Sequence, residues 1–367
     1  MNREKIFIIA GEDSGDLHGA KLIESLKKKN PSAEFFGIGG NRMQSAGLIL
    51  IEHIKNLNVI GIFEVIKHYP RIKKIFNKTI KEIKKIRPHK VILIDYPGFN
   101  LRLAKELKAL NFNITYFILP QVWAWKESRI KVLKDCCNKL ISIIPFEKTW
   151  FAKKGLDVHY IGHPLSSLSN QKYDRKRFCI KNNIPEDNKI IVLMPGSRKT
   201  EIKKHWPVFE KTLEVLMSKR SDLSFILLEG ENVSIESNLD LIKIRENQYE
   251  ALNVGDAAIV CSGTATLEAT MLKCPMIVCY KLSPPTWFLA KLLSKVKYLS
   301  LTNLIAEKEV VKEFLQGDMN EKNLSEGIIF LLKKENSDNL ILEYDKLISK
   351  LKNNKGSYDL AAQYIYD

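Results

Sequence analysis

The sequence predicts an α/β protein with two domains of similar size, each containing a parallel sheet covered by helices on both faces. Short apolar segments alternate with amphipathic helical segments along most of the chain, and this order of elements is typical of parallel sheets. The chain has 367 residues, more than one hydrophobic core usually serves. We therefore expect one parallel sheet in each half.

Composition narrows the class of partner. Lys and Arg number 58 against 42 Asp and Glu, which gives a net charge of +16. A polyanionic partner is expected, whether a nucleotide, a nucleic acid or an anionic membrane. The 6 cysteines include no Cys-x-x-Cys pair and no histidine at ligand spacing. They indicate reduced structural thiols in a cytoplasmic protein.

No export signal is expected at the start of the chain. The first apolar strand, expected at 5–10, follows Met1 too closely for a charged region, an apolar region and a cleavage site. No window approaches the roughly 18 uninterrupted apolar residues of a spanning helix. Any contact with a membrane is therefore expected to be peripheral.

The first half, residues 1–164, is expected to form one domain. Strands are expected at 5–10, 35–38, 91–94, 116–119, 140–144 and 158–161. A glycine-containing loop after the first strand matches neither a dinucleotide fingerprint nor a phosphate-binding Walker loop. Its residues are expected to face an acceptor or a cleft: Glu12, Ser14, Gly15 and Asp16.

Asp95 ends the strand at 91–94, and parallel sheets bind their ligands at the carboxyl ends of strands. It is the candidate catalytic base, while a structural cap for the helix from Leu101 is the alternative. The next strand leads into an aromatic loop with Gln121, Trp123 and Trp125. Gln121 and Trp123 are candidates for the same cleft, although buried packing also explains the tryptophans.

A helical pattern at 63–85 is both amphipathic and basic. From residue 67 to residue 87 Glu82 is the only acid, and the lysines and arginines lie at 67, 71, 73, 74, 78, 81, 84, 85 and 87. Such a helix can lie on an anionic membrane surface. A helix packed on the core with a solvated basic face is the alternative.

A more polar segment at 165–188 is expected to link the halves. The second domain is expected at 165–330, with strands at 190–194, 225–228, 257–260 and 276–280. An apolar helix at 286–293 either touches lipid or packs between domains. Residues 331–367 are expected to form C-terminal helices that pack back on the first domain or on a partner subunit.

Two corners of the second half resemble anion sites. In the first, an apolar strand runs into Ser262, Gly263 and Thr264 and then into a helix, whose free N–H groups favour phosphate. The serine and threonine are expected to cap the first turn. Glu268 lies one turn further and can reach a sugar hydroxyl. An ordinary capped helix after a buried strand is the alternative.

The second corner carries a fixed cation. The strand at 190–194 continues into Gly196, Ser197 and Arg198, where the glycine opens the backbone and the guanidinium can fork onto diphosphate oxygens. Both corners bind the same ligand if their strands are parallel neighbours. Asn303 is a further candidate for a hydrogen bond to a base or sugar.

The chemistry of these candidates favours glycosyl transfer. The sequence has no Asp-x-Asp clamp for a metal-bound sugar nucleotide, so no metal and no cofactor are expected. Two helix corners and Arg198 can neutralise a leaving diphosphate instead. This arrangement suits a GT-B glycosyltransferase, with two Rossmann-like domains facing across a cleft, the donor on the second and the acceptor on the first.

Several motifs resemble the lipid A disaccharide synthase family, in the family's order over about residues 6–315. They are Gly-Glu-Asp-Ser-Gly-Asp at 11–16, Ile-Asp-Tyr-Pro-Gly-Phe-Asn at 94–100, Gln-Val-Trp-Ala-Trp at 121–125, Pro-Phe-Glu at 145–147, Ile-Gly-His-Pro at 161–164, Pro-Gly-Ser-Arg at 195–198, Ser-Gly-Thr-Ala-Thr-Leu-Glu at 262–268 and Asn-Leu-Ile-Ala at 303–306.

The resemblance implies transfer of 2,3-diacylglucosamine from UDP to the 6-hydroxyl of 2,3-diacylglucosamine 1-phosphate (lipid X), with a β-1,6 linkage and release of UDP. It implies Asp95 as base and Arg198, 262–268 and Asn303 around UDP. It also implies a protein peripheral on the inner face of the inner membrane, either monomeric or a homodimer exchanging C-terminal helices. Gly98 departs from the family, because many relatives have a second acid there, so Asp95 must act alone.

The resemblance also makes membrane docking by 63–85 the favoured interpretation, because both substrates are acylated. Two other functions stay open at this point. An isomerase or hydrolase of UDP-N-acetylglucosamine can use the same scaffold without a lipid acceptor. A basic nucleic-acid-binding protein is the other alternative, but the lysines are spread along helices without interleaved aromatic residues.

Overall fold

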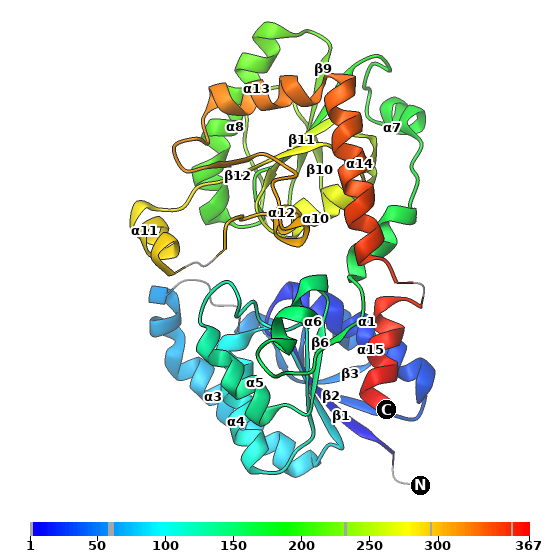
Figure 1. Ribbon diagram of the computed structural model, residues 1–367, viewed down its shortest axis with the longest axis vertical. Coiled ribbons are helices and arrows are strands. Elements are labelled where there is room, and N and C mark those ends of the chain that lie inside the picture. Colours follow the sequence, from blue (N-terminus) through cyan, green and yellow to red (C-terminus); the bar gives the residue numbers. More distant parts are fainter. Residues whose placement is uncertain (1–2, 58–61, 231–232, 294–295, 354) are drawn as a thin grey trace. The chain divides into compact units, whose positions relative to one another are not determined.

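The computed structural model describes residues 3–57, 62–230, 233–293, 296–353 and 355–367. The chain forms two compact units (Figure 1). Unit 1 comprises Met1–Pro164 together with Asn353–Asp367, and unit 2 comprises Leu165–Lys352. Each unit contains one parallel sheet with helices, so the predicted α/β class is confirmed.

The sheet of unit 1 has seven strands in the order β3-β2-β1-β4-β5-β6-β7, with every neighbouring pair parallel. The strands are β1 (Lys5–Ile9), β2 (Glu34–Gly39), β3 (Leu48–His53), β4 (Lys90–Ile94), β5 (Ile114–Phe117), β6 (Lys139–Ser142) and β7 (His159–Tyr160). The strand order reverses between β1 and β4. Open parallel sheets bind ligands at such a switch point, beyond the carboxyl ends of the strands.

Helices cover both faces of this sheet. They are α1 (Asp13–Lys29), α2 (Asn41–Ser45), α3 (Ile62–Ile86), α4 (Pro97–Ala109), α5 (Ile130–Cys136), α6 (Pro145–Ala152) and α15 (Ser357–Tyr366). Helices α3, α4 and α5 lie together on one side, and α1 and α15 lie side by side on the other (Figure 1). The central strands are therefore apolar without alternation, as in Ile6–Ile9, where every residue is fully buried.

The sheet of unit 2 has six parallel strands in the order β10-β9-β8-β11-β12-β13. They are β8 (Lys189–Met194), β9 (Leu223–Leu228), β10 (Ile242–Ile244), β11 (Ala257–Cys261), β12 (Met276–Tyr280) and β13 (Glu313–Leu315). The helices are α7 (Arg175–Lys181), α8 (Lys199–Lys219), α9 (Gln248–Val254), α10 (Thr264–Met271), α11 (Pro284–Leu293), α12 (Leu301–Ala306), α13 (Glu321–Leu331) and α14 (Lys334–Leu351). The switch point lies between β8 and β11.

The C-terminal helices are divided between the units. Helix α14 belongs to unit 2, whereas α15 returns to unit 1 and packs on α1. There Tyr358 bonds His18 with 2.8 Å between the hydroxyl and Nδ1, and Tyr364 stacks on His159 with 4.2 Å between the ring centroids. The expected polar linker at 165–188 contains a 3₁₀ segment, Pro164–Asn170, and helix α7.

Helix α3 continues through Pro70 and buries one apolar face in unit 1. Ile75 and Ile83 belong to the core of the unit, and Ile72 and Phe76 pack against that core. The basic side chains from Arg71 onward are exposed. The side chains of 58–68, and those of 289, 290 and 293 in α11, lie outside the described residues. Within the described part, no helix has the length and apolarity needed to span a bilayer.

Candidate active site

A pocket of about 360 Å³ lies at the switch point of unit 2. Strands β8 and β11 are parallel neighbours, with Met194 opposite Val260, so the segments that follow them meet at one edge. The pocket is lined by residues from both predicted corners: Gly196, Ser197, Arg198, Ser262, Gly263, Thr264 and Glu268. The two corners therefore form one site, as the sequence required for a shared ligand.

Helix α10 opens towards this pocket with unfilled hydrogen-bond donors. Its N-cap is Gly263, which makes no side-chain cap, and the backbone N–H groups of Thr264 and Ala265 bond no described residue. The predicted capping by Ser262 is wrong, because its hydroxyl donates to the carbonyl of Leu299 at 3.0 Å. The free N–H groups and the helix dipole favour an anion at this point.

Arg198 supplies the cation of the pocket. It stands immediately before α8, and its side chain is 48% exposed, with its Nη1 atom 3.2 Å from Oε1 of Glu201. Glu201 also accepts a hydrogen bond from the hydroxyl of Tyr280 at 3.1 Å. Glu201 lines the pocket and was not among the sequence candidates, although its place in the first turn of α8 was a signal. An arriving diphosphate would compete with this carboxylate for the guanidinium.

Gly196 is required by the backbone at the second corner. Its φ of +122° is a conformation that side chains rarely adopt, and an added Cβ atom would stand 2.9 Å from Oε2 of Glu201. Below this corner the buried His205 holds the carbonyl of Pro195 at 2.9 Å through Nδ1 and accepts the N–H of Lys281 at 3.0 Å. This histidine fixes the loop between β8 and α8 from beneath.

Two further polar side chains lie along the pocket wall. Burial raises the pKa of Glu268, and a hydrogen bond from Tyr249 opposes that rise. Gln248, which the sequence did not single out, lines the pocket and donates from Nε2 to the carbonyl of Glu229 at 2.7 Å. These groups suit hydroxyl and amide partners beside a phosphate.

Asn303 is fully buried and its side chain is committed to its own unit. Its Nδ2 atom donates to the carbonyl of Val311 and to Glu313, both at 2.8 Å, and its Oδ1 atom accepts the N–H groups of Val310 and Val311. The structure therefore places Asn303 among the supports of the segment 299–313 and outside the lining of the pocket.

In unit 1, Asp95 follows β4 in an unusual backbone conformation. Asp95 and Tyr96 have positive φ values of 42° and 46°, which cost energy for residues other than glycine. Two side chains hold the Asp95 carbonyl: the Tyr116 hydroxyl at 2.7 Å and the Nδ2 atom of Asn100 at 2.8 Å. The N-cap of α4 is Tyr96 and no side chain caps this helix, so the Asp95 carboxylate does not cap α4.

The pKa of the Asp95 carboxyl is raised towards neutral pH. Burial, and to a smaller extent the charge of Glu12, raise its pKa to about 6, against the opposing effect of a backbone hydrogen bond at Tyr96. Glu12 is the N-cap residue of α1, at the end of the neighbouring strand β1. The switch point of unit 1 therefore brings a second carboxylate close to Asp95, although residue 98 is glycine.

The other candidates of the first loop differ in exposure. Ser14 is exposed, whereas Gly15 is buried. A Cβ atom added to Gly15 would lie 3.2 Å from the Cβ atom of Ala10, so a glycine here allows close packing. Asp16 is buried, and its carboxylate accepts the N–H groups of Gly40, Arg42 and Met43. Asp16 thus anchors the start of α2 within the unit.

The aromatic loop after β5 rests on a buried acid. Gln121 is exposed, whereas Trp123 is buried and donates from Nε1 to Oε1 of Glu147 at 2.8 Å. Ser142 donates to the other oxygen of this carboxyl at 2.5 Å. Burial, and to a smaller extent the charge of Asp95, raise the pKa of Glu147 to about 7, while its hydrogen bonds from Ser142 and Trp123 oppose the rise. The motif 145–147 was noted in the sequence, but no role was assigned to this acid.

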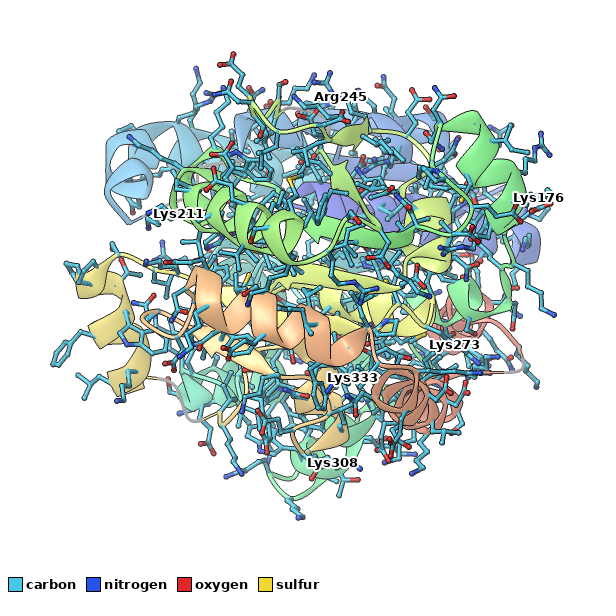
Figure 2. The ribbon with its side chains drawn as sticks, turned by 90° about the horizontal axis from the view of Figure 1, so that it is seen from above. Lys176, Lys211, Arg245, Lys273, Lys308 and Lys333 are labelled. Atoms are coloured by element: carbon cyan, nitrogen blue, oxygen red, sulfur yellow. The ribbon has the colours of Figure 1, made fainter. Side chains whose placement is uncertain are left out.

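The surface charge of unit 2 is dispersed. Figure 2 shows six cationic side chains that project from different elements and in different directions: Lys176, Lys211, Arg245, Lys273, Lys308 and Lys333. Several pair with acids, as Lys273 does with Asp345 at 2.7 Å. Such a distribution does not form the continuous basic stripe that nucleic-acid-binding proteins present.

Comparison with known proteins decides the family. The profile of the Lipid-A-disaccharide synthetase family matches residues 6–364. The chain belongs to this family. Lipid-A-disaccharide synthase 1 of Legionella pneumophila (strain Lens) is 38% identical over 336 residues, which cover 89% of this chain and 88% of that protein. Lipid-A-disaccharide synthase of Syntrophus aciditrophicus is 34% identical over 341 residues, covering 90% and 89%.

Solved structures agree on the fold of this family member. A glycotransferase of kitacinnamycin gives a TM-score of 0.68 at 13% identity, covering 100% of this chain and 99% of that one. UDP-GlcNAc 2-epimerase from Neisseria meningitidis, bound to UDP-GlcNAc, gives 0.66 at 13% identity, covering 99% and 100%. The chain has the GT-B fold, and it is a glycosyltransferase with lipid-A-disaccharide synthase activity. The epimerase and nucleic-acid alternatives are not favoured.

Proposed function

We propose that unit 2 binds the UDP-sugar donor in the pocket between the ends of β8 and β11, and that unit 1 presents Asp95 to the lipid acceptor. The observation that supports this most strongly is the pocket itself, which gathers Arg198, a glycine corner and the free N–H groups of α10. A diphosphate carries the charge and oxygens that these groups recognise. Gly196, Ser197, Ser262, Gly263 and Thr264 surround it, and Glu268 bonds a sugar hydroxyl.

The reaction is an inverting displacement that needs one base. The Asp95 carboxylate takes the proton from the 6-hydroxyl of 2,3-diacylglucosamine 1-phosphate as that oxygen attacks the anomeric carbon of the donor. The bond between this carbon and the diphosphate oxygen breaks, and its electron pair leaves with UDP. Arg198 and the N–H groups of α10 stabilise the negative charge on UDP, so the transfer proceeds without a metal ion.

We assign the remaining candidate residues to the acceptor side or to the support of the site loops. Glu12 keeps the pKa of Asp95 high enough for it to act as a base near neutral pH, and it lies on the acceptor side with Ser14, Gly15, Gln121 and Trp123. We assign Asp16 and Asn303 a supporting role for their loops, which their internal hydrogen bonds favour.

We also propose that the protein docks peripherally on the inner face of the inner membrane through α3. The apolar side chains of α3 from Ile72 onward pack on the core, while its lysines remain exposed, so the docking by this stretch is electrostatic. Vesicles containing anionic lipid should therefore capture the protein at about 0.1 M salt and release most of it at about 0.5 M. Equal capture by neutral vesicles, or indifference to salt, would contradict docking by α3.

The experiment for the proposed function is mass spectrometry of the products. The purified protein is mixed with UDP-2,3-diacylglucosamine and lipid X in detergent with a metal chelator. The wild type should form a tetraacyl disaccharide phosphate and UDP. Asp95→Asn should form them at least about a hundredfold more slowly, while Asp135→Asn, a matched change of an exposed aspartate in unit 1, should retain activity. Product from Asp95→Asn at the wild-type rate would overturn the assignment of the base.

A further inference from the structure

A second cavity lies in unit 1 beside the proposed base, between α3 and α4. Its volume is about 550 Å³, within the range that proteins use for small ligands. The walls are largely aromatic and aliphatic: Tyr69, Ile72, Phe76, Tyr96 and Phe99. Phe99 contacts Phe76 edge to face with 5.2 Å between the ring centroids, so the two helices share one apolar wall.

The cavity begins one residue after the proposed base. Tyr96 and Gly98 line it, and both directly follow Asp95 at the end of β4. Tyr96 is held rigidly, because its hydroxyl donates to the carbonyl of Leu57 at 3.1 Å and its ring covers Gly11. A molecule bound in the cavity therefore lies close enough to extend to Asp95.

The lining of the cavity includes cationic side chains. Lys73 of α3 and Arg102 and Lys105 of α4 also line the cavity, together with one acid, Glu106. All three cationic side chains are exposed, and none has an ion-pair partner within the described residues. Apolar walls with cationic side chains suit a molecule that combines a hydrocarbon chain with a phosphate.

We infer that this cavity binds a fatty-acyl chain of the phosphorylated acceptor, and that Gly98 sets how much of the chain it admits. The inference rests on the proposed function for the identity of the acceptor. Its physical basis is the coincidence of an apolar cavity, three exposed cationic side chains and the neighbouring carboxylate in one unit.

Gly98 is suited to this role because its replacement is tolerated by the backbone. An added Cβ atom has no heavy atom within 4 Å, and the φ angle of Gly98 is not among the positive ones. A larger side chain at this position therefore folds without strain and occupies space in the cavity. Gly317 of unit 2 has the same open surroundings and lies outside both pockets described, so it provides a matched control.

The test compares acceptors of different chain length in the wild type, Gly98→Leu, Gly98→Trp and Gly317→Leu. The Gly98 variants should lose kcat/KM by on the order of tenfold or more with the longest chains and less with shorter ones, since a hydrophobic pocket discriminates by such factors per methylene. Gly317→Leu should match the wild type. An unchanged chain-length profile in both Gly98 variants would overturn the inference while leaving the proposed function intact.

A binding measurement separates the two proposals. Dodecyl phosphate, titrated below its micelle concentration by calorimetry, should bind the wild type and Gly317→Leu, and bind Gly98→Trp at least tenfold more weakly. Inorganic phosphate alone should bind at least tenfold more weakly than dodecyl phosphate, because it lacks the chain. If the wild type binds dodecyl phosphate in this way but makes no disaccharide, the proposed function fails and the cavity stands. Equal affinity of Gly98→Trp and wild type would contradict the cavity.

Discussion

The two units place groups of opposite charge at the same position in the same type of sheet. In unit 1 the strand order reverses between β1 and β4, and in unit 2 it reverses between β8 and β11. Carboxylates gather at the first switch point, with Asp95 beside Glu12, whereas Arg198 and the free N–H groups of α10 gather at the second. The sheet thus determines where a binding site forms, and the few residues after each strand determine the charge of that site.

The backbone at these points differs in the same way. Unit 1 forces two residues with side chains, Asp95 and Tyr96, into positive φ and holds them with hydrogen bonds from neighbouring strands and helices. Unit 2 uses Gly196 and Gly263, which leave the helix ends open to a ligand. A fixed carboxylate suits proton transfer, while an open corner suits close approach of a diphosphate.

The largest expected effect is that of Asp95→Asn, which should lower the rate without changing the affinity of unit 2 for UDP. Loss of the base should reduce kcat by roughly 10² to 10⁴, with the affinity for UDP unchanged because unit 2 is intact. In the wild type, kcat/KM should rise with pH through about 6, where the carboxyl loses its proton. Initial rates across the pH range measure kcat and kcat/KM, and calorimetric titration measures the affinity for UDP. A rate that falls as pH rises through this region would exclude Asp95 as the base.

The same substitution should raise the free energy of unfolding, which tests whether the Asp95 carboxyl is buried. The folded pKa of Asp95, about 6, lies above the ordinary value of 3.8, so the folded state binds the proton more tightly, and stability falls as pH rises from about 4 to about 6 and then stays constant. Asp95→Asn removes this penalty of at most about 3 kcal/mol at pH 8, and the gain should vanish below pH 4.

Urea unfolding at the two pH values measures the difference. Asp135→Asn, in which an exposed carboxylate is replaced, should show little change at either pH. Equal stability of wild type and Asp95→Asn at high pH would show that the carboxyl is well solvated in the folded state.

A smaller effect is expected in unit 2 from Arg198→Ala. Removal of a hydrogen-bonded cation costs about 1.5 to 3 kcal/mol, so the Kd for UDP should rise by roughly ten- to a hundredfold. Arg177→Ala removes an exposed arginine of the same unit that lies outside the pocket, and UDP affinity should not change. Calorimetric titration of UDP distinguishes them, and similar Kd values for the two variants would remove Arg198 from the site.

The smallest effect is expected for Glu147→Gln. The pKa of Glu147, about 7, makes the carboxyl largely neutral below pH 7, and an amide keeps the acceptor for Trp123 Nε1. Stability at pH 6 should therefore change by less than about 1 kcal/mol, whereas Glu147→Ala should lose about 1 to 3 kcal/mol because a buried donor is left without a partner. Urea unfolding with tryptophan fluorescence gives both values. An equal loss in the two variants would mean that the hydrogen bond to Trp123 does not matter.

Local patterns predicted the framework and the second-unit pocket well. A buried strand, a glycine and the start of a helix together occupy only about ten consecutive residues, so this pattern can be recognised from sequence. Both corners, around Gly196 and Gly263, were predicted in this way. The strands β3, β10 and β13 were not predicted. Strands β10 and β13 have three residues each, and of the six residues of β3 only Leu48 is buried.

Polar residues were harder to assign, because a sequence does not tell whether a side chain meets a ligand or its own chain. Asp16 accepts three N–H groups from the segment 40–43, and Ser262 donates to Leu299, which lies 37 residues away. The proximity of Glu12 to Asp95, and the cavity between α3 and α4, likewise arise only when distant segments pack together.

The most direct test of the claim that unit 2 binds UDP while unit 1 supplies the base is a crystal structure of the protein with UDP. The account predicts diphosphate oxygens roughly 3 Å from the Arg198 guanidinium and from the N–H groups of Thr264 and Ala265, with the Asp95 carboxylate bonded to neither phosphate. A diphosphate seated on the loop 11–16 of unit 1, with Arg198 still paired to Glu201, would contradict it.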